Sequence, residues 1–319
     1  MTAYALLCFL GAGYDHHEPS ANRTTVRKGI DYLCAHQGPD GRLGVRNYEH
    51  AIATLALVQA YAESADPDLE GAAQHAIDAV LTHQNREAGA VDERTAGLGW
   101  GYRYSDPAHN DSSVSAWNVL ALASAAAAGL EVGNGLVGAR QWLVRAWRAA
   151  NSDWATLTDP ATAVSGFPYR WDAQSGEAQR ADTGASGHDL APAGALCAAF
   201  LGHPAGSPML ESLANRILQE RLPASYPCNT YDLVLCTLAL FQLGGERWTR
   251  WNNVVRDMLV KAQHSEPACF AGSWDWQGTS FPGQTHGRLL STAYCCLCLE
   301  VYFLYQRGGG GALTLRHWP

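Results

Sequence analysis

Residues 50–62 have the sequence HAIATLALVQAYA, a run that is apolar and rich in alanine on almost every face of a helix. A helix that is apolar all round must be buried on most of its faces. The next run, residues 69–83, places apolar residues at spacings of three and four, with charged residues opposite them. That spacing is typical of a helix at the outside of a domain. The two runs therefore predict a pair made of one buried and one outer helix.

The same alternation recurs along the chain, which indicates a repeat architecture. Runs of the buried type lie at residues 2–11, 50–62, 114–128, 192–201, 231–243 and 290–305, and runs of the amphipathic type lie at residues 25–36, 69–83, 136–149, 209–221 and 248–263. Strand-like alternation of period two is scarce. The pattern predicts an all-α fold, an α/α toroid (barrel) with about six inner and five to six outer helices. An open solenoid would show the same alternation, so closure of the ring is an inference.

Composition favours one large domain. The chain has 319 residues, of which 47% are hydrophobic and 16% charged. This length exceeds the usual size of a single core, but closed barrels are common exceptions. We expect one toroid domain over residues 1–306, with residues 151–187 as a long loop or lid. Residues 307–319 are expected to form a flexible, glycine-rich tail.

The distribution of charge bears on partners. The net charge of −8 is spread along the chain, and Lys and Arg form no cluster that could follow phosphates, so nucleic acid is not expected as a partner. No apolar run reaches the roughly 18 to 20 residues that span a bilayer, so no transmembrane segment is expected. The oligomeric state stays undetermined by the sequence.

Cysteine usage bears on the compartment. Five of the nine cysteines, Cys8, Cys236, Cys295, Cys296 and Cys298, lie inside apolar runs, where free cysteine behaves as a small buried hydrophobe. An odd number also leaves at least one thiol unpaired in a monomer. A reducing compartment, and hence the cytoplasm, is favoured over secretion.

A glutamine motif follows several of the outer runs. Gln37 is followed by Gly41 and Leu43, Gln84 by Gly99 and Trp100, and Gln263 by Gly272 and Trp274. This pattern resembles the Gln-x-x-x-Gly-x-Trp repeat of squalene and oxidosqualene cyclases. With GLGWGY at residues 97–102 and STAYCCLCLEVYF at residues 291–303, the chain resembles a bacterial squalene-cyclase or protein-prenyltransferase-like repeat protein over residues 2–305. The resemblance implies an α/α toroid of the terpenoid-cyclase superfamily that holds an apolar small molecule or lipid, such as an isoprenoid, in its central cavity.

In such a toroid the starts of the inner helices meet at one mouth of the cavity. The candidate catalytic residues there are Glu49, His50, Asp111, His188, Asp189, Asp232 and His286. The candidate substrate-binding residues are Trp100, Tyr102, Tyr104, Tyr231, Trp274, Trp276 and Arg288. Each type also has a structural explanation, because aspartate caps helix N-termini and aromatic residues pack at helix ends.

Two isoprenoid templates fit poorly. Class II cyclases protonate an alkene with an Asp-x-Asp-Asp segment, and residues 111–114 retain only its first aspartate. Ser113 stands at the proton-donating position, and a hydroxyl is too weak an acid. Protein prenyltransferases hold zinc with Asp, Cys and His. Asp232 and Cys236 share a helix face and His286 opens the next inner helix, but the spacing of the first two differs from the usual Asp-x-Cys. No cofactor is therefore expected, with zinc on these three residues as the alternative.

Two other classes of function remain open. An α/α-barrel glycosidase or lyase needs two carboxylates, or a carboxylate with His or Tyr, across a cleft. Glu49, Asp111, Asp189 and Asp232 could supply them, with Trp274 and Trp276 as sugar platforms, although no local motif supports this class. A noncatalytic scaffold that binds a peptide or a glycan is the other alternative. The leading prediction is binding or conversion of an apolar ligand.

Overall fold

The computed structural model describes most of the chain. The described residues are 1–86, 98–104, 106, 108–151, 162–179, 189–204, 206–276 and 281–304, without the side chains of 281–286 and 303–304. His188, the predicted tail at 307–319 and much of the predicted lid at 151–187 lie outside these residues, as does the side chain of His286.

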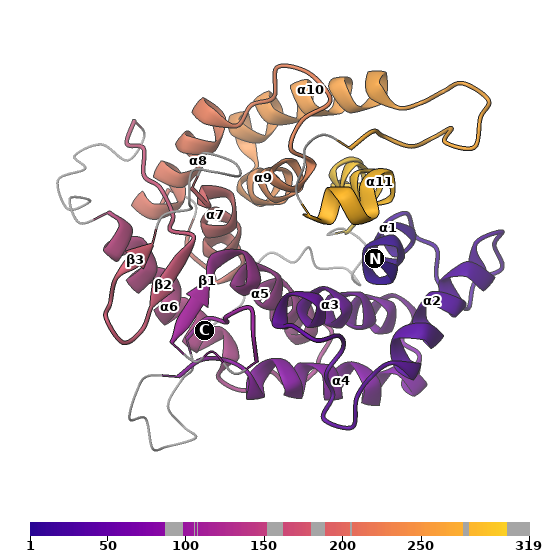
Figure 1. Ribbon diagram of the computed structural model, residues 1–319, viewed down its shortest axis with the longest axis horizontal. Coiled ribbons are helices and arrows are strands. Elements are labelled where there is room, and N and C mark those ends of the chain that lie inside the picture. The colour runs from indigo at the N-terminus through magenta and orange to yellow at the C-terminus, as the bar shows by residue number, and fades with distance from the viewer. Residues whose placement is uncertain are drawn as a thin grey trace.

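The apolar runs form a closed ring of inner helices. These are α1 (Thr2–Gly11), α3 (Asn47–Ser64), α5 (Ser112–Ala127), α7 (Ala191–Phe200), α9 (Thr230–Leu243) and α11 (Phe281–Leu304). Each helix packs on the next, and α11 packs on α1, which closes the ring (Figure 1). The α/α toroid predicted from the alternation is therefore confirmed, and the open solenoid is excluded.

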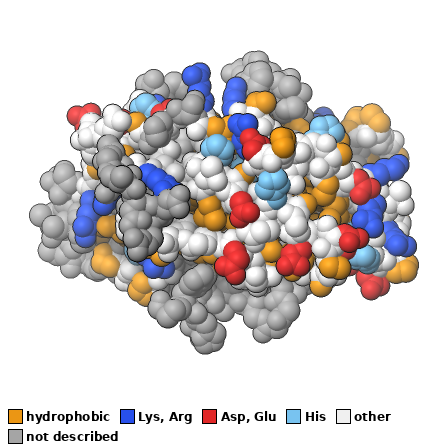
Figure 2. All heavy atoms as spheres, turned by 90° about the horizontal axis from the view of Figure 1, so that it is seen from below, with side chains coloured by type: hydrophobic (Ala, Val, Ile, Leu, Met, Phe, Trp, Pro, Cys, Tyr) orange, Lys and Arg blue, Asp and Glu red, His pale blue; other side chains and the backbone are white. Residues whose placement is uncertain are grey.

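The amphipathic runs form the outer ring. It consists of α2 (Arg23–Ala35), α4 (Pro67–Thr82), α6 (Gly135–Ala150), α8 (Pro208–Glu220) and α10 (Gly245–Ala262). In α2, for example, the stripe Val26, Ile30 and Leu33 is buried while its charged residues face outward. Figure 2 shows acidic, basic and histidine side chains interspersed over one side of the molecule. Inner and outer helices alternate along the chain, so all inner helices run in the same direction.

Aromatic side chains fill the centre of the inner ring. Tyr4 on α1 meets Trp117 on α5 edge-to-face, with ring centroids 5.7 Å apart, although α3 separates these two helices in the ring. Tyr294 on α11 packs against Tyr4 at 5.0 Å and against Tyr231 on α9 at 5.9 Å. Because rings from non-neighbouring helices touch, the axis near these residues is packed with side chains.

A small antiparallel sheet was not predicted. Its strands are β1 (His109–Asp111), β2 (Arg170–Asp172) and β3 (Ala178–Gln179), in the order β1-β2-β3. Strand β1 leads directly into α5. The sheet therefore ties residues 162–179, the described part of the predicted lid, to the start of an inner helix.

The last inner helix contains a break. Helix α11 is broken at Gly287, whose φ of 44° and ψ of −122° are not helical, so the apolar run predicted from residue 290 is its second part. All nine cysteines are free thiols. Of the five expected to be buried, Cys236, Cys295 and Cys298 are buried, whereas Cys8 and Cys296 are partly exposed. Among the described residues, no helix combines the length and the apolar character needed to cross a membrane.

Candidate functional site at the mouth of the toroid

The parallel inner helices bring their N-terminal ends to one mouth. Asp111 immediately precedes α5, Asp189 lies just before α7, and Asp232 lies in the first turn of α9. These three predicted residues therefore come from successive helices of the inner ring. Arg288 follows the break in α11 at the same end. The positive ends of several helix dipoles point toward this mouth, which favours negative charge there.

Asp111 is the most deeply buried of these acids. Its residue is 1% exposed, its Oδ1 accepts a hydrogen bond from Arg170 Nε at 3.3 Å, and its Oδ2 has no hydrogen-bond partner among the described protein atoms. Burial raises the pKa of the Asp111 carboxyl, and the neighbouring Arg170 guanidinium opposes that shift. A carboxyl in such surroundings retains its proton to higher pH than an exposed one.

Asp189 and Asp232 share one arginine. Arg221 Nη1 lies 3.0 Å from Asp232 Oδ2, and its Nη2 lies 3.4 Å from Asp189 Oδ1 and donates to the Asp189 carbonyl oxygen at 2.8 Å. Arg216 Nε lies 3.0 Å from the other oxygen of Asp189. The Asp189 carboxylate also accepts from the Ala191 N–H at the start of α7. Two carboxylates and two guanidinium groups thus form one charged cluster between α7 and α9.

Tyrosines cover the part of the mouth next to Asp111. Tyr102 stacks on Tyr48 with centroids 6.1 Å apart and an interplanar angle of 16°. The Tyr102 hydroxyl lies 3.2 Å from Ser113 Oγ and accepts from the Tyr169 hydroxyl at 3.4 Å. Tyr169 comes from the segment that leads into β2, and its carbonyl accepts the Ser112 N–H. The segment at residues 162–179 therefore supplies both Tyr169 and Arg170 to the mouth.

A second polar group lies beside α11. Asp275 pairs with Arg288 and also accepts from His264 Nε2 at 3.0 Å. The Tyr226 hydroxyl donates to the Asp275 carbonyl. Trp276 is half-buried, and its indole N–H has no hydrogen-bond partner among the described atoms. Trp276 is therefore a partly exposed aromatic residue next to Asp275 in the chain, with its indole nitrogen buried.

The structure shows that the glutamine motif stabilises the wall of the toroid, which is formed by the two rings of helices and the loops between them. Gln84 Nε2 donates to the carbonyls of Leu98 and Gly135, and Gln37 Nε2 donates to those of Gly41 and Ala72. Gln263 Nε2 donates to the Gly272 carbonyl. Each glutamine thus ties the end of an outer helix to the loop that follows it, and the first two also reach the next outer helix.

The motif tryptophans belong to the same wall. Trp100 and Trp274 are almost fully buried, and their indole N–H groups donate to the carbonyls of Val80 and Leu259 in the preceding outer helices. The first repeat has Leu43 in this position, and nearby His50 bonds the following outer helix instead, with Nε2 at 3.1 Å from the Ala76 carbonyl oxygen in α4. These side chains therefore lie between the two rings of helices.

Three other predicted residues make local contacts. His50 is fully buried, its Nδ1 accepts from the Leu43 N–H, and burial lowers its pKa to about 4. Glu49 is exposed and accepts the Val45 N–H through Oε2, which is a helix-start contact. Tyr104 lies under the Arg42 guanidinium, 4.8 Å from its carbon to the ring centroid. Tyr104 thus contacts the α2–α3 loop.

Two of the three residues in the zinc alternative are poorly suited to bind an ion, one because it is paired and one because it is buried. Asp232 is paired with Arg221, and Cys236 lies one turn deeper, fully buried in the core, where burial raises the pKa of its thiol far above the ordinary value. A protonated thiol is a poor zinc ligand. The side chain of His286, the third member, lies outside the described residues.

Sequence reasoning missed Arg170, Arg221 and Tyr169. Arg221 caps the C-terminal end of an amphipathic helix, and no spacing rule connects it to acids in two inner helices. Arg170 and Tyr169 lie in a segment without helical periodicity. The stretch SGFPYRW at residues 165–171 was the signal available, since its aromatic residues and central proline indicate an ordered loop.

Comparisons with known proteins place the fold. No family model matches the chain, and no curated protein matches it. Among solved structures, the glycoside hydrolase family 76 mannosidase of Bacteroides thetaiotaomicron has a TM-score of 0.62 at 12% identity, over 96% of this chain and 86% of that one. The unsaturated glucuronyl hydrolase of Streptococcus agalactiae has a TM-score of 0.62 at 15% identity, over 94% and 81%. An α-1,6-mannanase of Salegentibacter, bound to α-1,6-mannotetrose, has 0.60 at 12%, over 95% and 87%.

These comparisons correct two expectations. The resemblance to squalene cyclases and protein prenyltransferases is wrong, because the similar structures are α/α-toroid glycosidases and a glucuronyl hydrolase. The glutamine motif misled because its side chains hold outer helices and their loops together and do not line a ligand site. The expected apolar or lipid partner is also wrong, since the ligands named in similar structures are mannose oligosaccharides. The packed aromatic centre of the ring agrees with this second correction.

Proposed function

We propose that the protein cleaves a glycosidic bond in a carbohydrate bound at the mouth, as an α/α-toroid glycosidase or lyase. The observation that carries this proposal is the Asp111 carboxyl, which is buried at the start of an inner helix, has a raised pKa and has one oxygen without a protein partner. The fold shared with glycosidases supports it.

Asp111 is proposed as the general acid. Glycosidases commonly use one carboxylic acid that retains its proton and one carboxylate. Protonated Asp111 would give its proton to the glycosidic oxygen as the bond from that oxygen to the anomeric carbon breaks. Because Arg170 is 29% exposed and covers Asp111, its side chain would have to move aside for a substrate to reach the acid.

The Arg221 cluster is proposed to supply the second carboxylate. Asp232 is 16% exposed, somewhat more than Asp189 at 13%, so it is the better placed to meet a water molecule. The Asp232 carboxylate would take a proton from that water as the water oxygen adds to the anomeric carbon, which completes a hydrolysis. Arg221 and Asp189 would hold Asp232 in place. Two carboxyl groups suffice for this reaction, so it requires no cofactor.

Aromatic side chains would bind the sugar. Tyr48 and Tyr102 present stacked phenol rings beside Asp111, and Trp276 adds a half-buried aromatic ring beside Asp275. Sugars present apolar faces edged by hydroxyls, so such amphipathic rings suit them. Of the other predicted residues, Glu49, His50, His188 and His286 stay candidates without an assigned step.

One difference from a similar structure limits what carries over. The Salegentibacter mannanase is inactivated by replacing two consecutive aspartates. In this chain Asp111 is followed by Ser112, and no Asp-Asp pair occurs anywhere in the sequence. The second carboxylate would therefore come from another helix, so neither the sugar nor the linkage can be transferred from that enzyme.

The test compares point variants on defined sugars. Product release from α-1,6-mannotetraose, from an unsaturated glucuronyl disaccharide and from a panel of aryl glycosides is measured for the wild type, Asp111→Asn, Asp232→Asn and the control Asp257→Asn. On a sugar that is cleaved, Asp111→Asn should lower kcat by about 10²-fold or more, because general acid catalysis contributes that much. The exposed Asp257 lies on α10 and should not matter. An Asp111→Asn protein that folds and retains full activity would refute the assignment.

A noncatalytic glycan-binding module is the second candidate. It is favoured by the observation that Asp111, Asp189, Asp232 and Asp275 each contact an arginine. Such pairing suits a rigid binding surface as well as a catalytic one. Saturable binding of a glycan by calorimetry, without product release over the whole panel, would decide for this candidate.

A further inference from the structure

A compact group of metal-ligand types lies away from the mouth. His16 and His17 follow the C-terminal end of α1, and Asp66 follows the C-terminal end of α3. Because inner helices are parallel, these loops lie at the end of the toroid opposite Asp111, Asp189 and Asp232. The nitrogen and oxygen donor atoms of the three side chains all lie within 4.8 Å of one another. The group is therefore separate from the proposed glycan site.

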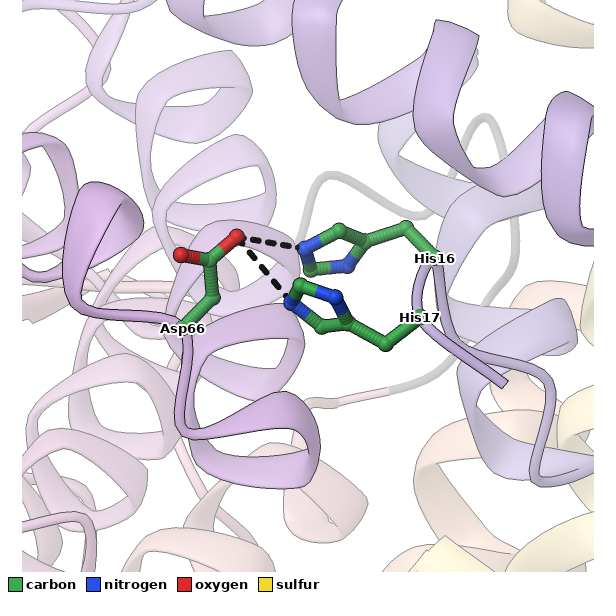
Figure 3. Close-up of side chains that lie close together, drawn as sticks. All are labelled: His16, His17 and Asp66. Carbon is green, nitrogen blue, oxygen red and sulfur yellow. Dashed lines mark hydrogen bonds and ion pairs between the residues drawn. The ribbon is translucent and has the colours of Figure 1, made fainter.

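The three side chains converge on one point. His16 Nε2 lies 2.7 Å and His17 Nε2 lies 3.2 Å from the same atom, Asp66 Oδ2 (Figure 3). The two imidazole rings lie side by side, with centroids 4.1 Å apart. A tetrahedral zinc ion with bonds near 2.1 Å keeps its ligand atoms about 3.4 Å apart. Small side-chain movements would therefore open these contacts into a coordination sphere.

The backbone on both sides holds the ligands in position. Asp15 Oδ1 accepts the N–H groups of His17 and Glu18 at 2.7 and 2.6 Å, and Arg23 Nε donates to the His16 carbonyl at 3.0 Å. Across the group, Asp66 Oδ1 accepts the Asp68 N–H at the start of α4, which leaves Oδ2 for the histidines. A ligand set fixed from the outside in this way loses little freedom when it binds an ion.

Burial and access are also suited to an ion. His16 and Asp66 are buried, whereas the His17 side chain is 47% exposed and opens the group to solvent. Without an ion, the His16 Nε2–H donates to Asp66 Oδ2, because a carboxylate oxygen can only accept. His16 Nδ1 has no partner among the described atoms, so the ring proton can move to Nδ1 and leave the Nε2 lone pair for an ion. Two imidazoles and one carboxylate form a donor set that suits zinc and leaves a fourth position for water.

We propose that His16, His17 and Asp66 form a zinc site that joins the α1–α2 loop to the α3–α4 loop. The ion would replace the hydrogen bonds between the histidines and Asp66 with three bonds from the same atoms. Its role would be to stabilise the packing of α1 on α3, next to the point where the ring closes. This proposal does not depend on the chemistry at the mouth.

The test is a zinc titration of the full chain after removal of metals with a chelator. Calorimetry should show one saturable equivalent of Zn²⁺ and a rise in Tm, because a ligand that binds only the folded state stabilises it. Co²⁺ should give the visible absorption of a four-coordinate site. His17→Gln and Asp66→Asn should each weaken Zn²⁺ binding by at least about tenfold, since loss of even an outer-shell partner costs that much.

The variants are chosen to keep the fold. His17 is exposed, and the amide oxygen of asparagine can still accept the Asp68 N–H, so neither change should unfold the protein. His36→Gln, which alters an exposed histidine on another loop, is the matched control and should bind as the wild type does. Absence of saturable binding, or equal binding by His17→Gln, Asp66→Asn and the wild type, would overturn the zinc site.

Discussion

Arg221 and Asp232 form an ion pair of 3.0 Å between the end of an outer helix and the start of an inner one, and the Arg221 side chain is only 3% exposed. The same guanidinium contacts Asp189, so one buried cation holds two acids from neighbouring inner helices. Removing a buried cation takes a countercharge from its buried partners, and that loss exceeds what the pair itself contributes.

We therefore expect Arg221→Met to lower the free energy of unfolding by about 3 to 5 kcal/mol, the range typical of a broken buried ion pair. The control is Arg256→Met, because Arg256 and Asp257 form an exposed pair at 2.9 Å. An exposed pair contributes at most about 1 kcal/mol. Urea unfolding of both variants gives the comparison. Equal effects would mean that the Arg221 cluster does not hold the mouth together.

The pH dependence of stability should depend on His50. Its pKa is about 4 in the folded protein, against about 6.5 when unfolded, because burial disfavours the charged ring. The stability associated with neutral His50 is complete above pH 6.5 and is lost as the pH falls toward 4, with a total of about 3 kcal/mol. His50→Gln should flatten this slope in urea unfolding series between pH 7 and pH 4. An unchanged slope would mean that another group causes the pH dependence of stability.

Glu300 on α11 should have the opposite dependence. Its pKa is raised to about 8, chiefly by burial, and its Oε2 has no partner among the described atoms. The folded state binds this proton more tightly than the unfolded state, so stability should fall as the pH rises from about 4.5 to 8. Glu300→Gln removes the charge at constant shape and should stabilise the protein at pH 8 by about 1 to 3 kcal/mol. The measurement is thermal unfolding of both proteins at pH 5 and pH 8. A variant that stabilises the protein equally at both pH values would contradict this expectation.

The glutamine motif can be tested with two of its own members. Gln84 is buried and donates to two carbonyls, at 2.7 and 2.8 Å, whereas Gln263 is exposed and donates to one. Gln84→Ala should lower the free energy of unfolding by about 2 to 4 kcal/mol, because it leaves buried carbonyls unpaired. Gln263→Ala should lower it by less than about 1 kcal/mol. If the two variants unfold at the same urea concentration, the motif does not act through these bonds.

Arg170 should set the upper pH limit of any glycosidase activity. The acid must be protonated, so activity should fall as the pH rises through the pKa of Asp111, which burial raises. Arg170 opposes that rise, and Arg170→Gln should therefore move the alkaline limb of the kcat/KM profile to higher pH. An unchanged profile, with kcat/KM lowered uniformly, would assign Arg170 to substrate contact instead.

The helical architecture could be predicted because the spacing of apolar residues within each segment shows it. Residues 50–62 and 69–83 show their buried and outer character without any knowledge of neighbours, and they became α3 and α4. The small sheet could not be predicted, because β1 to β3 have three, three and two residues, too few to show a period of two. Closure was an inference from the alternation and could not be read from any one helix, since a contact between α1 and α11 leaves no mark on either segment.

The candidate site was predicted only in outline. Asp111, Asp189 and Asp232 lie at the mouth because helix starts can be located from sequence, but their arginine partners come from a loop and an outer helix. The motif tryptophans were expected to bind substrate but are structural. The sequence around Trp100 would be the same whether its side chain lined a cavity or packed within the wall. Only the hydrogen bond from its indole N–H to the Val80 carbonyl shows that it packs within the wall.

The contact of α1 with α11 also constrains how the protein is made. Cys8 donates to the Ala293 carbonyl across 285 positions of sequence, and Tyr4 and Tyr294 meet through their hydroxyls at 3.3 Å. Contacts of such separation form late, because the intervening chain must first be ordered. During synthesis, α1 therefore leaves the ribosome long before its partner exists, and its apolar face stays uncovered until α11 emerges.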